Sequence, residues 1–438
     1  MSSAPRVARA GTGEIGVVGW RCAVCGATVD IGAPMLFRCP NATADDPRHA
    51  LRIVQHDEPV RAVSDDPNPF VAYRPHFAWD SHAAVHGMDV ADRDALVRDV
   101  DARVAAIAGT RFVVTPYSRA DALSDALGFS TDGGIWIKDE TRQVAGSHKA
   151  RHLVTSLLYL LVGEATGTVP WTRGSRPSLA IASCGNAALA AATLAAAVEW
   201  PVEVFVPAWA SGAVTTRLGE LGAQITVCPR VDTGPVGDPC VHRYREAVAA
   251  GSIPFSVQGP ENAWCLDGGR TVGWEIGADR PDHLFIQVGG GAFARCTVGA
   301  LAQTGVIPKF HAVQTEACAP LARAWKRALA GPGGFAAAAQ HWDEIMTPWE
   351  HVGTSAADGI LDDETYDWIG VINGIHASHG APVIVKETEI LQANELAHEL
   401  TDIDVSHTGS AGLAGLLAIR DVISDHERVG VVFSGIRR

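Results

Sequence analysis

Short apolar runs alternate with segments of helical periodicity over most of this chain. Each run is rich in β-branched residues, and in the segment after it apolar positions recur every three or four residues. Strands alternating with helices along a chain are typical of parallel sheets covered by helices. The pattern therefore predicts an α/β protein. We expect strand–helix pairs at 178–183 with 185–200, 202–207 with 212–222, 223–229 with 241–250, 283–291 with 292–305, and 309–316 with 319–330.

Further elements flank this alternation. Residues 133–141 predict a strand, and an apolar helix follows that opens at Lys149. Residues 428–434 predict a last strand with Ser434 at its end. The stretch 331–365 is interrupted by Gly, Ala and Pro, so we expect it to be an excursion on the surface.

Composition narrows the class of protein. The 438 residues allow two or three domains and a large core. A net charge of −14 argues against a nucleic-acid partner, which would require a clustered basic face. The N-terminus has no signal-peptide core, and the apolar stretch 187–198 is too short to enter a membrane. Nine cysteines do not indicate a disulfide framework, so we expect a cytoplasmic protein.

The N-terminal segment 1–65 carries a pattern of metal ligands. Cys22 and Cys25 have the spacing of a zinc knuckle, and Cys39 and His49 follow within reach. Three thiolates and an imidazole would complete a closed, structural zinc site. A metal-free loop and a redox pair remain as alternative interpretations. We expect a small zinc-ribbon-like appendage.

Lys149 is the first candidate for chemistry. The chain has only five lysines, and this one lies among small residues at the mouth of an apolar helix. Partial burial disfavours the charged form of an ammonium group, and a lowered pKa makes the amine a usable nucleophile or base.

Three junctions between strands and helices are candidate binding sites. The turn Ser183–Asn186 offers free N–H groups to a carboxylate or an oxyanion, although Asn186 could simply cap a helix. Gly289, Gly290 and Gly291 allow backbone amides to approach an anion, although a triple glycine is also an ordinary flexible turn. Ser434 lies where open α/β sheets bind ligands, although it could equally be a core serine.

Taken in this order, these pieces resemble the pyridoxal-phosphate enzymes of fold type II, in the group of threonine synthases, threonine and serine dehydratases and serine racemases. The resemblance runs from about residue 112 to the C-terminus. "IWIKDETRQVAGSHKAR" is similar to the dehydratases. Threonine synthases instead carry Asn-Pro-Thr at Arg142–Val144, and an apolar residue usually stands at His148. "VSHTGSAGLAGLLAI" and the cysteine-rich N-terminus are more similar to threonine synthases.

The resemblance implies two parallel-sheet domains and a cofactor site. The large, cofactor-binding domain would comprise 66–177 and 273–438, and the small domain 178–272. Lys149 would form an imine with pyridoxal 5'-phosphate. The resemblance also implies that the chain forms a homodimer. The other cofactor contacts would be Gly289, Gly290 and Gly291 to the phosphate, Asn186 to the ring hydroxyl and Ser434 to the pyridine nitrogen.

The implied substrate is a small α-amino acid. Its carboxylate would rest on the turn that includes Ser183 and Gly185, with Ser147 and His148 nearby. Lys149 would remove the Cα proton, and loss of a β-substituent would give elimination (an ammonia-lyase or dehydratase) or β-replacement. We expect Glu140, Arg151 and Thr408 to form walls of the site.

Two other reactions remain open at this point. A threonine synthase-like γ-elimination and replacement would need cations for a phosphorylated side chain, for which Arg142 and Arg151 are candidates. Cys184 stands where serine racemases carry an acid/base serine. A thiol there could act opposite Lys149 and give racemisation or epimerisation.

Overall fold

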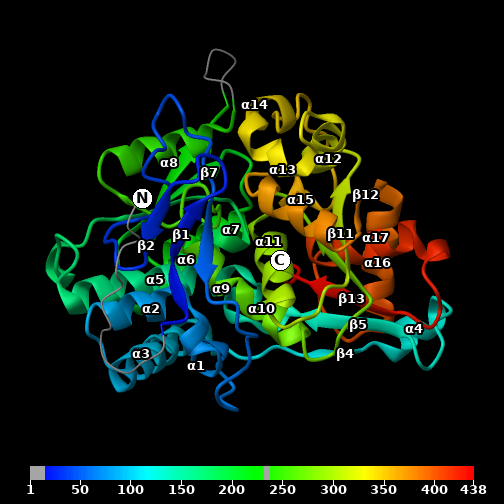
Figure 1. Cartoon of the computed structure of the whole chain (residues 1–438), viewed down its shortest axis with the longest axis horizontal. Coiled ribbons are helices and arrows are strands. Elements are labelled where there is room, and N and C mark those ends of the chain that lie inside the picture. The colour runs from blue at the N-terminus through cyan, green and yellow to red at the C-terminus, as the bar shows by residue number, and fades with distance from the viewer. Residues whose placement is uncertain (1–14, 231–236) are drawn as a thin grey trace, which may run out of the picture.

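The computed structural model describes residues 15–230 and 237–438, and three sheets organise this part of the chain (Figure 1). A small antiparallel sheet near the N-terminus has the strand order β2-β1-β3. The other two sheets are a four-stranded and a six-stranded one, which lie side by side in the view of Figure 1. The bounds of the small sheet are β1 (Val17–Cys22), β2 (Thr28–Asp30) and β3 (Leu51–Gln55).

The six-stranded sheet has the order β12-β11-β10-β13-β5-β4 and is parallel except for β4. Its central strands are almost wholly apolar and buried, as expected for a sheet covered on both faces. The last strand, β13, lies between β10 and β5 and pairs with both. The strands are β4 (Tyr117–Arg119), β5 (Gly134–Asp139), β10 (His283–Gln287), β11 (Lys309–Thr315), β12 (Ala381–Val385) and β13 (Arg428–Phe433).

Helices cover both faces of this sheet. One face packs against α10, α11 and α15 in one apolar cluster. The other face packs against α16 and α17 in a second cluster. These helices and their neighbour α12 are α10 (Arg270–Ile276), α11 (Ala292–Gln303), α12 (Pro320–Ala330), α15 (Trp368–Ala377), α16 (Glu387–Leu400) and α17 (His407–Ala418).

The four-stranded sheet is entirely parallel, in the order β8-β7-β6-β9. Together with the six-stranded sheet it confirms the predicted α/β class. The alanine-rich helix α6 is buried along nearly its whole length because its small side chains allow close packing on both sides. The elements are β6 (Leu179–Ala182), α6 (Asn186–Ala197), β7 (Val202–Pro207), α7 (Gly212–Glu220), β8 (Gln224–Cys228), α8 (Pro239–Ala249) and β9 (Ile253–Pro254).

Helix α5 (Lys149–Thr166) is buried along most of its length, and it packs against α2, α6 and α9. The approach of α9 is so close that a Cβ on Gly268 would lie 1.8 Å from the carbonyl oxygen of Arg151. Glycine is therefore required there. The remaining helices are α1 (Pro69–Ala72), α2 (Ala78–Val85), α3 (Val90–Ala108), α4 (Asp121–Ala126), α9 (Cys265–Gly268), α13 (Gly334–Ala337) and α14 (Trp342–Ile345).

The segment 331–365 is more than the surface excursion that its composition suggests. Met346 is fully buried, and Trp342 and Ile360 are nearly so. Its scattered large apolar side chains insert into two different clusters, one with α12 and α15 and one with α17. Glycine and proline content indicated irregular backbone, but it did not reveal how these anchors are buried.

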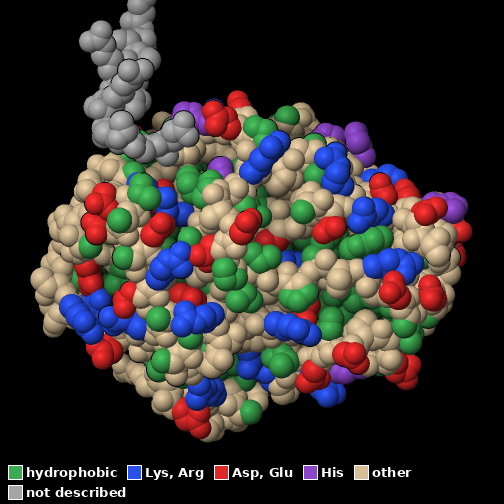
Figure 2. Space-filling view, turned by 90° about the horizontal axis from the view of Figure 1, so that it is seen from below, with side chains coloured by type: hydrophobic (Ala, Val, Ile, Leu, Met, Phe, Trp, Pro, Cys, Tyr) green, Lys and Arg blue, Asp and Glu red, His purple; other side chains and the backbone are tan. Residues whose placement is uncertain are grey.

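The surface is mixed in charge. On the face shown in Figure 2, acidic and basic side chains are interspersed among apolar ones. Among residues 15–230 and 237–438, none of the helices combines the length and the apolar character that a membrane span requires.

Candidate active site

Lys149 is the first residue of α5, as the sequence predicts. The chain reaches it through Ser147, which has extended backbone and bridges to Gly435 just after β13. The Lys149 side chain is half-buried, and within the described residues its amine makes no hydrogen bond or ion pair. Burial lowers the pKa of the amine, while the Asp362 carboxylate opposes that shift. The amine is therefore available to a ligand.

The turn between β6 and α6 offers a second set of groups. Residues 182–186 are all half-buried, and a Cβ on Gly185 would meet no atom within 4 Å, so the turn faces open space. No side chain caps α6, which leaves its first N–H groups for an anion. Burial raises the pKa of the Cys184 thiol in this turn to about 11, and the Asp358 carboxylate reinforces the shift.

The triple glycine forms the N-terminus of α11. Gly291 is the N-cap, with φ 93°, and no side chain caps the helix. A Cβ on Gly289 would lie 2.4 Å from Oδ2 of Asp362, and the backbone N–H of Gly290 lowers the pKa of that carboxyl against the effect of burial. An anion of the chain itself thus rests on the turn. Burial raises the pKa of Asp362 to about 6.

Ser434 is buried at the end of β13, next to the start of α5. The side-chain amide of Gln287 donates to its Oγ at 2.6 Å, which leaves the hydroxyl proton for another acceptor. Nδ1 of His148 lies 3.0 Å from the carbonyl oxygen of Ser434, and the His148 ring stacks on Phe293 with centroids 4.0 Å apart. His148 is thus a packed neighbour of the site. The Ser147 side chain is also buried, and its Oγ accepts from the N–H of Lys149 at 3.4 Å.

Asn186 is held by the last residue of the chain. The Nε–H of Arg438 donates to Oδ1 of Asn186 at 2.7 Å, and the same guanidinium also bonds the carbonyl oxygen of Ala145. Because Oδ1 is engaged, the Nδ2 donor of Asn186 is the free part of the amide. The C-terminus accordingly lies between the two large sheets in Figure 1.

Glu140, Arg151 and Thr408, which we expected to form walls of the site, make two different kinds of contact: the first two form ion pairs and Thr408 forms a hydrogen bond. Arg151 is fully buried and bonds Glu140 at 2.8 Å and Glu275 at 2.5 Å. Lys138 pairs with the same Glu275, so two cations and two carboxylates form one buried network. The Thr408 hydroxyl accepts from the N–H of Gly359 at 3.0 Å.

Arg142, the other candidate for an anion, lies at the surface. Its side chain is 65% exposed and pairs with Asp139 at 3.1 Å. Arg151, by contrast, is buried and saturated by two carboxylates, so it is not free to bind a phosphorylated substrate.

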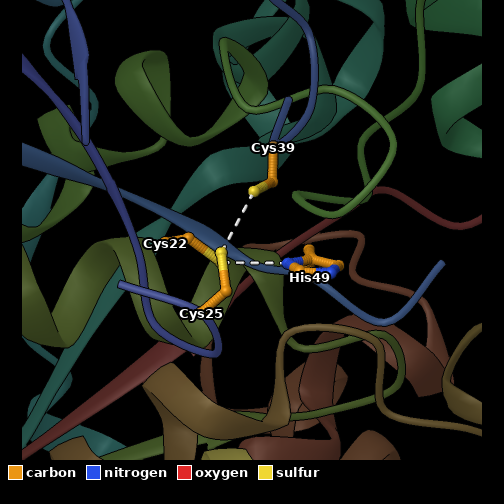
Figure 3. Close-up of side chains that lie close together, drawn as sticks. All are labelled: Cys22, Cys25, Cys39 and His49. Carbon is orange, nitrogen blue, oxygen red and sulfur yellow. Dashed lines mark hydrogen bonds between the residues drawn. The ribbon is translucent and has the colours of Figure 1, made fainter. Parts of the chain in front are cut away.

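The four predicted metal ligands form a separate cluster in the appendage (Figure 3). The ligand atoms of Cys22, Cys25, Cys39 and His49 all lie within 4.8 Å of one another. The spacing in the sequence thus identified a set of residues that the fold brings together.

Three residues at the site were missed in the sequence: Gln287, Asp362 and Arg438. Gln287 ends a strand that was expected, and Arg438 is four residues beyond Ser434. Neither carries a motif. The acidic run Asp362–Glu364 was the signal for Asp362, and several other acidic residues in the same stretch obscure it.

A half-buried amine of lowered pKa and a helix that begins at a triple glycine are features that a phosphorylated carbonyl compound would require. The chain belongs to the pyridoxal-phosphate dependent enzymes, whose family model matches residues 110–435. It is 25% identical over 336 residues to a threonine synthase of Methanosarcina acetivorans, covering 73% of this chain and 74% of that protein.

Solved structures share the fold at lower identity. A maize serine racemase is 18% identical, with a TM-score of 0.57 over 78% of this chain and 92% of its own. A diaminopropionate ammonia-lyase from Escherichia coli is 16% identical, with a TM-score of 0.59 over 78% of this chain and 88% of its own. These proteins establish the fold type II architecture and leave the reaction open.

The residues present fit the cofactor. A Cβ at any position of the triple glycine would meet neighbouring atoms at 3.2 Å or less, and the carboxylate of Asp362 already lies next to Gly289. Phosphate has the same requirement for N–H donors. Lys149 would bind the aldehyde carbon, Gly289–Gly291 the phosphate, Asn186 the ring oxygen and Ser434 the ring nitrogen. For the phosphate to bind, the Asp362 carboxylate must leave the turn or become neutral.

Proposed function

We propose that this enzyme removes a β-substituent from a small α-amino acid and releases a 2-oxo acid and ammonia. The observation that carries the proposal is that Arg151 is buried on Glu140 and Glu275 while Arg142 lies at the surface on Asp139, so neither is an unpaired, buried cation for the phosphorylated side chain that γ-replacement would use. The open turn at Gly185 supports a substrate carboxylate next to the cofactor site.

Each group at the site has a task that follows from its surroundings. The first N–H groups of α6 bind the substrate carboxylate and so orient the Cα–H bond. The Lys149 amine, whose pKa is lowered by burial, takes the Cα proton as a neutral base. Bound pyridoxal phosphate supplies the electron sink for the charge that develops at Cα. Ser434 offers a neutral donor to the ring, oriented by Gln287, so that sink is weaker than one paired with a carboxylate.

A second candidate reaction is racemisation, for which Cys184 is the specific observation. Its pKa of about 11 keeps the thiol protonated at neutral pH. A protonated thiol in the turn at Gly185 would return a proton to Cα from a direction other than that of Lys149. Elimination and racemisation share the first proton transfer, so one site could perform both.

A panel of amino acids tests the proposal. The enzyme loaded with pyridoxal phosphate is incubated with L-serine, L-threonine, L-2,3-diaminopropionate and O-phospho-L-homoserine, and oxo acid, ammonia and phosphate are measured. We expect oxo acid and ammonia in a 1:1 ratio if L-serine or L-threonine is the substrate, and in a 1:2 ratio if it is L-2,3-diaminopropionate, whose β-amino group also leaves as ammonia. Phosphate release from phosphohomoserine, without any oxo acid from the others, would overturn elimination in favour of γ-replacement.

Lys149→Ala supplies the matching loss of function. We expect the variant to lose the visible absorbance of covalently bound cofactor together with all oxo acid formation. Lys326→Ala, which removes an exposed lysine on α12, is the control and keeps both. Covalent cofactor on the Lys149→Ala protein would assign the reactive amine to another lysine.

A further inference from the structure

The cluster in the appendage has the dimensions of a tetrahedral metal site. Sγ of Cys22 lies 3.4 Å from Nδ1 of His49, and Sγ of Cys25 lies 3.6 Å from Sγ of Cys39 (Figure 3). Ligand atoms on a tetrahedral zinc ion are separated by about 3.4–3.8 Å, given Zn–S and Zn–N bonds of about 2.3 and 2.0 Å. These two pairs have that spacing, and all four ligand atoms lie within 4.8 Å of one another, so small adjustments of the side chains would bring them onto one ion.

The backbone fixes two of these ligands in a knuckle. Cys22 ends β1, and its carbonyl oxygen accepts from the N–H of Gly26 at 3.1 Å while its own N–H bonds the carbonyl oxygen of Ala27 at 2.8 Å. The N–H of Ala23 bonds the carbonyl oxygen of Ala50 at 2.8 Å, which brings the segment with His49 alongside. The arrangement exists without any bond between the sulfur atoms, since all three thiols are free.

Polar groups outside the cluster orient the ligands. Oδ2 of Asp46 lies 3.2 Å from Nε2 of His49, so the carboxylate accepts the proton of that nitrogen and leaves Nδ1 as the unprotonated one that faces the thiols. Nδ2 of Asn41 donates to Sγ of Cys25 at 3.4 Å. Support of this kind around a ligating histidine is characteristic of protein zinc sites.

We propose that Cys22, Cys25, Cys39 and His49 bind one zinc ion and that this ion has a structural role. Three thiolates and one imidazole fill a tetrahedral coordination shell, so no position remains for a substrate or a water molecule. The site lies outside the residues that carry the proposed reaction, and it stands independently of which amino acid the enzyme uses.

The ion would fasten the loop between Cys25 and Cys39 onto the catalytic body. At the end of this loop the N–H of Leu36 donates to Oη of Tyr159 at 3.2 Å, and the N–H of Ala263 donates to the carbonyl oxygen of Phe37 at 2.7 Å. Trp264, which stacks on Tyr159, bonds the carbonyl oxygen of Leu36. These contacts reach α5 and the start of α9, the two helices beside Lys149.

Metal analysis of the full-length protein tests the proposal. Purified without chelator, the chain is expected to hold about one zinc ion, and Cys25→Ser and Cys39→Ser to lower that content at least about tenfold. Cys228→Ala removes a buried cysteine of the four-stranded sheet and keeps the zinc. A wild-type protein that is folded but free of zinc, or that holds a disulfide within the cluster by mass spectrometry, would overturn the proposal.

Two further measurements test the proposal even if the cysteine variants fail to fold. Asp46→Asn keeps all four ligands, and we expect it to weaken zinc affinity about 10-fold or more, measured by competition with a chromogenic chelator. Chelation of zinc from the wild type is expected to lower the unfolding temperature reversibly, with recovery on adding zinc. An Asp46→Asn protein of unchanged affinity, or a chelated protein of unchanged stability, contradicts the structural role.

Discussion

Asp362 is the residue with the most unexpected position, because its carboxylate rests where a phosphate would bind. The charge of Lys149 and the backbone N–H of Gly290 both favour the charged form of this carboxyl. Two anions cannot share one set of donors without repulsion. With the phosphate placed at Gly289–Gly291, as we propose, the cofactor and Asp362 would compete for this turn.

Asp362→Asn is expected to tighten the binding of pyridoxal phosphate about tenfold, or about 1.4 kcal/mol. The amide fills the same space without charge. Because the pKa of Asp362 is raised to about 6, the wild-type carboxyl becomes neutral as the pH falls below 6, and the difference between the two proteins should shrink there. Titration of protein fluorescence with the cofactor at pH 5.5 and 8 measures both effects.

Asp363→Asn is the control for this prediction, since it removes the neighbouring charge and leaves the carboxylate on the turn. Weaker cofactor binding in Asp362→Asn would show that the carboxylate helps to hold the cofactor in place.

Cys184 gives a prediction about stereochemistry. If its thiol is the second acid, Cys184→Ala loses conversion of the L- to the D-amino acid but retains oxo acid formation. The thiol has a pKa of about 11, so the rate of racemisation should not change with pH through titration of this group between about 6 and 9. Chiral chromatography of the products measures both isomers. Full racemisation by Cys184→Ala would remove the thiol from the mechanism.

Sequence analysis located the residues that stand at ends of strands and helices, among them Lys149, Asn186 and Ser434. The local sequence is enough to predict such a junction, because a few apolar residues are followed there by small ones. The sequence did not identify Asp362 and Arg438 as site residues, because their partners lie about 70 and 250 residues away along the chain. No local pattern encodes a contact of that kind.

At the scale of elements, the buried ionic network joins β5, α5 and α10. Arg151, Lys138, Glu140 and Glu275 are inaccessible to water and satisfy one another. Removing one partner from such a group leaves an uncompensated charge in the interior. The network therefore fixes where Lys149, two residues before Arg151, lies relative to the six-stranded sheet.

Glu275→Gln should lower the free energy of unfolding by about 3–5 kcal/mol, because Arg151 and Lys138 lose the charge that compensates them. Urea denaturation followed by circular dichroism gives this value. The exposed pair Arg173–Glu199 provides the control, and Glu199→Gln is expected to cost less than about 1 kcal/mol. Equal effects of the two substitutions would contradict a structural role for the network.

The strand–helix alternation was predictable from periodicity, and the pairs around β6, β7, β10 and β11 confirm it. Two elements could not be predicted from periodicity. The antiparallel strand β4 (Tyr117–Arg119) is too short for a pattern and forms because β5 offers it an edge. The irregular stretch 331–365 is held by apolar anchors whose partners only the tertiary fold reveals.

At the scale of the whole molecule, a buried histidine links the appendage to the catalytic body. Nδ1 of His82, on α2, lies 2.7 Å from the carbonyl oxygen of Ile31, and its ring packs against Tyr159 and Trp264. Within the described residues its Nε2 has no partner, so protonation would place a charge in an apolar environment. Burial lowers the pKa of His82 to about 4.

This depressed pKa predicts acid sensitivity. The unfolded chain binds a proton at His82 below about pH 6.5, whereas the folded protein binds it only near pH 4. The unfolding free energy should therefore fall with decreasing pH in this window, by up to about 1.4 kcal/mol per pH unit from this group. His82→Gln, which keeps a donor and cannot be charged, is expected to flatten the profile. An unchanged profile would assign the acid sensitivity to other groups.

The order of strands in the six-stranded sheet has a consequence for synthesis. On the ribosome, β5 and β10 emerge well before β13, the strand that separates them in the sheet. Until β13 arrives, each presents an unpaired edge open to mispairing, which is a hazard in nascent chains. A polypeptide interrupted before residue 428 would lack both this joint and Ser434. Incomplete products of translation are thus expected to lack the proposed cofactor contact at Ser434.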